Sequence, residues 1–213
     1  TFIEPEKELT SEEAIVASGL NWDVKTQPLF LADGTQAPSN AVVRQDNNNI
    51  LGVVGQSYTP LQNNKAFEFF DPFIKSGEAM YETAGSLREG KRIWVLAKMN
   101  KDPMVIKGND IVEKYILLSN SHDGTMAVRA GFTPIRVVCN NTLSMAHSKG
   151  TSDLIRIRHG QNVETNVERV REIMNLANQQ FEATAEQYRF LASKQVNQAD
   201  LEKFVKLVFT GPK

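Results

Sequence analysis

The sequence has a single cysteine, Cys139, and only three histidines. One cysteine cannot form an intramolecular disulfide, and so few thiol and imidazole groups argue against a Cys/His zinc site. The signatures of zinc proteases and zinc deaminases are absent as well. The composition therefore predicts a protein of a reducing compartment that binds no metal, and we expect no other cofactor.

Long apolar segments are also lacking. No run approaches the roughly 18 apolar residues that a membrane span requires. The first residues, Thr-Phe-Ile-Glu-Pro-Glu, contain neither the basic nor the apolar region of a signal peptide, so we expect a cytoplasmic location. Because the sequence does not begin with Met and stops at Gly-Pro-Lys, we also expect it to be a fragment of a longer protein.

Motifs for phosphoryl transfer and glycoside hydrolysis are missing too. The two glycines of Gly52-Val-Val-Gly55 lack the Gly-Lys-Ser/Thr sequence that a nucleoside-triphosphate loop needs. The acid pairs Glu12-Glu13 and Glu78/Glu82 lie where helix ends or solvent explain them. They give no support for a glycosidase-type pair of carboxylates.

Charge is distributed unevenly along the chain, although the net charge is only −1. Residues 1–83 carry a net charge of −7, residues 84–158 carry +6, and residues 159–213 are neutral. This asymmetry is typical of an anion-binding middle beside an acidic flank. It also arises where alternating strands expose Lys on a solvated face, and the sequence leaves both explanations open.

The 213 residues, of which 41% are hydrophobic, suffice for one large domain or a domain with a helical extension. Apolar periodicity predicts strands at residues 22–30, 41–46, 50–55, 79–87, 91–99, 111–119, 126–132 and 154–158. It predicts helices at residues 10–19, 59–77, 134–146, 163–191 and 198–209. Thr133-Pro134 is interpreted as a helix start, as is Thr59-Pro60, and Pro72 should kink its helix or begin a second one.

Short connections between consecutive strands predict an antiparallel β-meander with helices on one side, an α+β fold ending in a long C-terminal helix. Strand 91–99 has apolar residues on both faces and is expected in the sheet interior. We divide the chain into an acidic N-terminal segment with a short helix and strand (1–40), a central α+β core (41–160) and a C-terminal helical region (161–213).

Cys139 and the histidines are the first candidates for catalysis. Cys139 could pair with His122, His147 or His159 as in cysteine hydrolases, but no cysteine-hydrolase signature surrounds it. His122-Asp123 could be a general base or part of a metal site, but further ligands are not evident. We favour a turn in which the Asp123 side chain caps its own backbone and Gly124 supplies a positive φ. No catalytic residue is therefore predicted.

Nucleic acid is the remaining ligand class, since basic and aromatic side chains alternate along the central strands. If these strands form one sheet, several basic residues converge into a strip. The residues expected to contact phosphate are Arg92, Lys98, Lys114, Arg129, Arg136, Arg156 and Arg158. Tyr115 and Phe132 are expected to stack on bases. No helix-turn-helix with a basic recognition helix is present to read a duplex.

Five segments in order carry a resemblance to a known family. They are Leu51-Gly-Val-Val-Gly-Gln-Ser-Tyr-Thr-Pro-Leu-Gln-Asn63, Gly90-Lys-Arg-Ile-Trp-Val-Leu96, Ser119-Asn-Ser-His-Asp-Gly-Thr125, Ile135-Arg-Val-Val-Cys-Asn-Asn-Thr-Leu143 and Ile157-Arg-His159. Together they resemble the phage/plasmid-like protein family, a domain of unknown function of bacteriophages and conjugative plasmids. The resemblance implies a mobile-element origin and action in the bacterial cytoplasm, and it carries over no catalytic residue.

The order of elements alone is similar to the core of phage single-strand annealing proteins of the RecT and Erf type, which form oligomeric rings or filaments around single-stranded DNA. This similarity is at the level of fold. Our leading hypothesis is a non-catalytic protein of phage or plasmid recombination that binds and anneals single-stranded DNA as a homo-oligomer. The alternative is a module that binds a host or phage protein through the acidic N-terminal part and helix 163–191.

Overall fold

The protein is described by a computed structural model, which covers residues 9–100, 104–107, 110–148 and 150–176 together with positions 187, 190, 191 and 193. Its centre is a five-stranded antiparallel sheet with the order β10-β9-β8-β5-β4. The strands are β4 (Ala79–Leu87), β5 (Arg92–Met99), β8 (Tyr115–Ser121), β9 (Val128–Thr133) and β10 (Asp153–Ile157). The predicted α+β class, with an antiparallel sheet and a C-terminal helix, is confirmed.

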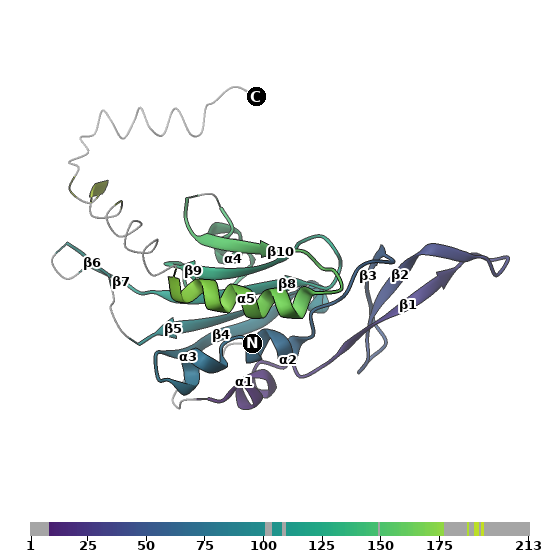
Figure 1. Ribbon diagram of the computed structural model, residues 1–213, viewed down its shortest axis with the longest axis horizontal. Coiled ribbons are helices and arrows are strands. Elements are labelled where there is room, and N and C mark those ends of the chain that lie inside the picture. Colours follow the sequence, from purple (N-terminus) through teal and green to yellow (C-terminus); the bar gives the residue numbers. More distant parts are fainter. Residues whose placement is uncertain are drawn as a thin grey trace, which may run out of the picture.

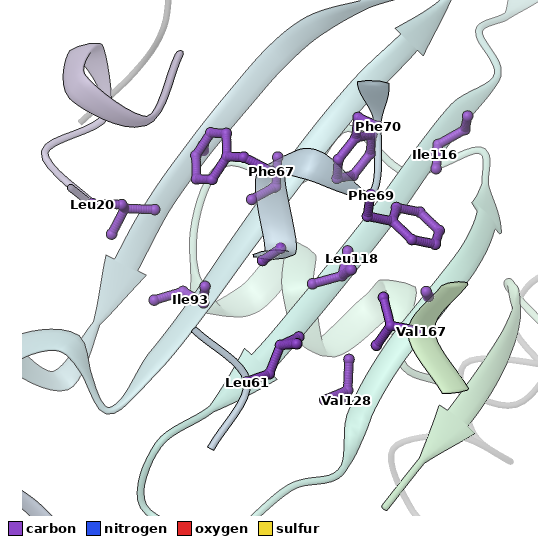
Figure 2. Close-up of a cluster of buried hydrophobic side chains, with 14 of the residues drawn as sticks. Leu20, Leu61, Phe67, Phe69, Phe70, Ile93, Ile116, Leu118, Val128 and Val167 are labelled. Carbon is purple, nitrogen blue, oxygen red and sulfur yellow. The ribbon is translucent and has the colours of Figure 1, made fainter. Parts of the chain in front are cut away.

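Helices cover both faces of this sheet (Figure 1). One face, here the α5 face, packs against α1 (Ser11–Ala17), α2 (Asn63–Glu68), α3 (Asp71–Lys75) and α5 (Val163–Leu176). Figure 2 shows the core of this face, to which α2 contributes Phe67, β8 contributes Leu118 and α5 contributes Val167.

The opposite face, here the α4 face, packs against α4 (Asn140–Ala146). Its core includes Trp94, Leu96 and Leu117 from β5 and β8, together with Leu143 from α4. The expectation of helices on one side only is therefore wrong. Because β5 and β8 are apolar on both faces, each face needs a cover.

A second antiparallel sheet, β1 (Val24–Phe30), β2 (Gln36–Arg44) and β3 (Ile50–Gly55), extends away from the body (Figure 1). The predicted turn between β2 and β3 is confirmed, since Asn48 has a φ of 59° there. β6 (Met104–Lys107) and β7 (Asp110–Val112) form a separate two-stranded pair.

Local sequence signals located several ends correctly. Thr10 and Glu13 form a reciprocal capping box at the start of α1. Pro72 lies in the first turn of a second short helix, α3, as one of the two expected outcomes. β5 pairs with β4 and β8, so its predicted interior position is confirmed.

Other boundaries were predicted wrongly. α2 begins at Asn63 rather than at Thr59-Pro60, and α4 begins at Asn140 rather than at Thr133-Pro134. Thr133 instead ends β9, and Val137 lies in the core of the α4 face. The predicted strand 111–119 is broken between β7 and β8. Helix 163–191 is confirmed over Val163–Leu176, whereas most of 177–191 and all of helix 198–209 lie outside the described residues.

Candidate nucleic-acid interface

Arg129 and Arg156 are direct cross-strand partners at the β9–β10 edge of the five-stranded sheet. Arg129 also pairs with Ser119 on its other side, in β8. Directly opposed residues of antiparallel strands share a face, with Cβ atoms about 5 Å apart. The three side chains therefore form a row on the α4 face, because Leu154 beside Arg156 and Leu117 beside Ser119 belong to the core of that face.

Arg92 completes the group. It pairs with Ser121, two residues along β8 from Ser119, so it lies on the same face as Arg129 with β8 between them. We refer to Arg92, Arg129 and Arg156 as the arginine cluster. Strand register alone brings these residues together, since they are far apart in the sequence.

A hollow of about 400 Å³ lies beside the arginine cluster. Arg129 and Arg156 line it from the sheet, and residues 146–148, 150 and 152–155 line it from the end of α4, the α4–β10 connection and the start of β10. Asp153 is the one acidic residue of this lining. Along β10 it alternates with Leu154 and Arg156, which directs its side chain toward the opposite face.

Among the described residues the arginine cluster forms no ion pair with a carboxylate, although Arg92 Nη2 donates to Thr125 Oγ1 at 3.2 Å and the charge of Arg92 lowers the pKa of Asp123. Other basic side chains do form ion pairs, at distances of 2.5 to 2.8 Å: Arg44–Asp46, Lys65–Glu68, Lys75–Asp71, Lys98–Glu113 and Arg136–Glu82. Within the described part of the chain, the buried Nε atoms of Arg92 and Arg129 also lack a hydrogen-bond acceptor. Uncompensated donors of this kind favour binding of an anion.

The electrostatics of this region show the crowding of positive charge. Burial lowers the pKa of Arg129, and the positive charges of Arg156 and Arg92 lower it further. Burial, followed by the charges of Arg129, Arg92 and Arg156, lowers the pKa of His147 to about 4. Like charges held together in this way cost free energy, which a bound anion would recover.

His147 caps the C-terminus of α4, and its Nε2 is hydrogen-bonded to Ser119 Oγ at 2.9 Å. This contact holds the end of α4 over the arginine row. Sequence analysis considered His147 only as a partner for Cys139 and missed Ser119. No local signal relates the two residues, because their contact depends on α4 crossing β8.

Lys98 and Arg136 stand apart from the arginine cluster because acids neutralise both of them. Lys98 Nζ is 2.8 Å from Glu113 Oε1, and Arg136 Nε is 2.6 Å from Glu82 Oε1. Arg158 is exposed just after β10. Of the seven basic residues expected to contact phosphate, the structure thus brings together Arg92, Arg129 and Arg156, with Arg158 following β10.

The two aromatic residues expected to stack on bases lie in the protein core. Tyr115 is 5% exposed on the α4 face, and Phe132 is 7% exposed on the α5 face. Lys114 is also buried, with its ammonium 4.6 Å from the centroid of the Phe132 ring. These three residues are removed from the interface, since packed rings leave no open face for a base.

Cys139 is exposed at the N-cap of α4 and contacts Thr142, whose backbone amide lowers the pKa of the thiol. No hydrogen bond joins Cys139 to a histidine. His147 bonds to Ser119, His122 to Asn63 and His159 to the backbone carbonyl of Thr59. The geometry does not form a cysteine–histidine pair.

The His122-Asp123-Gly124 turn has the predicted structural form. Asp123 Oδ1 accepts a hydrogen bond from the backbone N–H of Thr125 at 2.9 Å, and Gly124 has a φ of +73°. His122 itself is fully buried, and burial lowers its pKa to about 3. It is a neutral interior histidine at pH 7.

Among the described residues, no group of three or more His, Cys, Asp or Glu is arranged to hold a metal ion. No described helix is both long and apolar enough to cross a membrane.

The fold and site define an antiparallel α+β protein with three arginines on one sheet face that form no ion pair among the described residues. The model of the family described as "Domain of unknown function (DUF932)" matches residues 50–213, and the chain belongs to this family. No match was found among curated proteins or among solved structures.

Proposed function

We propose that the protein binds single-stranded DNA on the α4 face of the five-stranded sheet and promotes annealing in phage or plasmid recombination. The observation that carries this proposal is the arginine cluster, whose three guanidinium groups form no ion pair with a carboxylate among the described residues. Phosphate is the anion that arginine recognises best in nucleic acids, because its planar donors fit two phosphate oxygens.

A single strand fits this site better than a duplex. The arginine cluster lies on sheet strands beside α4, and no described helix presents a basic face for a DNA groove. Sequence-tolerant binding of single strands depends on backbone contacts along a positive surface. With Tyr115 and Phe132 buried, we expect these phosphate contacts to supply most of the affinity.

Fluorescence anisotropy with a labelled oligothymidine tests the proposal at about 50 mM salt, where phosphate contacts are strong. The double variant Arg129→Gln/Arg156→Gln should weaken binding at least about tenfold, as expected for loss of charge-assisted hydrogen bonds. Arg136→Gln is the matched control, because Glu82 already neutralises Arg136. Circular dichroism should show that both variants fold. Failure of the wild-type protein to bind would overturn the proposal.

The second candidate function is binding of another protein chain. It is favoured by exposed apolar side chains on the β1–β2–β3 sheet. Phe30, Leu31, Ile50 and Val53 are 58 to 62% exposed there. For the annealing class this surface would join copies of the chain into the expected homo-oligomer. Light scattering should then give a multiple of the chain mass, which Phe30→Ser/Val53→Ser should lower. A monomeric wild type would instead favour a host or phage protein as the partner.

A further inference from the structure

The arginine cluster is arranged for one concentrated negative charge rather than for a long chain of charges. Arg129 and Arg156 are directly opposed across β9 and β10, and Arg92 lies on the same face two strands from Arg129, with β8 between them. Each of the other two arginines lowers the pKa of Arg129, so the three charges act on one another. Side chains that served successive phosphates of a strand would instead be spread along the face.

The site also has boundaries. The hollow of about 400 Å³ is bordered by the end of α4, where His147 is held by Ser119, and by the connection that leads into β10. Ser148 and Ser152 add hydroxyl groups to its lining. A hollow bordered in this way accommodates the end of a strand more readily than a strand that passes through.

We propose that the arginine cluster binds a phosphate monoester, so that the protein holds single-stranded DNA by a phosphorylated end. This inference rests on the proposed function and specifies its ligand. An internal phosphodiester carries one negative charge, whereas a terminal monoester carries between about 1.5 and 2 at pH 7 and offers three strong acceptor oxygens. The opposed guanidinium groups of Arg129 and Arg156, with Arg92 on the same face, match the monoester more closely in charge and in number of donors.

The test compares labelled oligothymidines that differ only at their ends: 5′-phosphate, 3′-phosphate, or hydroxyl at both. We expect one phosphorylated oligonucleotide to bind about tenfold tighter than the hydroxyl form, the effect of one further charge-assisted contact. This preference should disappear in Arg129→Gln and persist in Arg136→Gln. Thymidine monophosphate should compete with the phosphorylated oligonucleotide.

The outcomes separate this inference from the proposed function. Equal binding of all three oligonucleotides would overturn the monoester site while single-stranded DNA binding stands. If the protein binds thymidine monophosphate but none of the oligonucleotides, the monoester site is supported and DNA is rejected as the ligand that carries the monoester. Absence of binding to any of these probes would overturn both. A preference that survives Arg129→Gln would place the monoester elsewhere and contradict the inference.

Discussion

His122 Nε2 and Asn63 Oδ1 form a buried hydrogen bond of 3.0 Å that joins the β8 end to the first residue of α2. The Asn63 amide group donates to the carbonyl oxygens of Leu20 and Trp22, which fixes its Oδ1 as the acceptor. His122 Nε2 therefore carries the proton. The ring is neutral because burial lowers its pKa to about 3.

This bond predicts that stability falls as the pH is lowered from 7 to 5. The unfolded chain protonates His122 near pH 6.5, whereas the folded chain keeps it neutral until about pH 3. The stabilisation is thus present above pH 6.5 and is lost as pH falls, by about 2 kcal/mol at pH 5. Urea unfolding at pH 7 and pH 5 measures how much of the free energy of unfolding is lost between them. This loss should be about 2 kcal/mol smaller in His122→Asn than in the wild type. The same loss in both proteins would contradict the assignment.

Gly52 is predicted to tolerate no side chain. A Cβ atom at this position of β3 would lie 2.6 Å from the Cα of Asp123, which is backbone and cannot turn away. Gly52→Ala should cost about 1 to 3 kcal/mol, the usual range for overpacking. Gly55→Ala in the same strand is the control, since nothing lies within 4 Å of its added Cβ. Equal unfolding midpoints for the two variants would show that β3 does not contact the turn.

Cys139 is predicted to be dispensable. It is exposed and forms no histidine pair, and a serine at the N-cap can replace its contacts with Thr142. Cys139→Ser should change the free energy of unfolding by less than about 0.5 kcal/mol and leave DNA affinity unchanged. A loss of activity in this variant with its stability intact would instead indicate a thiol-dependent function.

Sequence patterns predicted the fold correctly where a local signal is compatible with only one structure. Apolar residues on both sides of strand 91–99 placed it in the sheet interior, and Thr10 with Glu13 marked the start of α1. The dipeptide Thr-Pro, in contrast, is compatible with a turn as well as with a helix start. At Thr133 the hydroxyl accepts from the Ile135 amide in a local turn, and the helix begins later, at Asn140.

The candidate site was predictable only in part. The sequence singled out Arg92, Arg129 and Arg156 as basic positions on strands, but their grouping depends on register across β10, β9, β8 and β5. The sequence did not show that Tyr115 packs in the core beside α4. Tyr115 and Phe132 are buried because both faces of the sheet are packed.

Salt dependence of single-stranded DNA binding tests the arginine cluster most directly. Each phosphate contact contributes about −0.7 to the slope of log affinity against log salt concentration for a single strand. Loss of the phosphate contact made by the cluster in Arg92→Gln/Arg129→Gln/Arg156→Gln should therefore make the slope shallower by at least about 0.7. The control, Lys25→Gln/Arg136→Gln/Arg169→Gln, removes the same charge from exposed positions outside the cluster and should keep the wild-type slope. Equal slopes for the two triple variants would contradict the proposed DNA site.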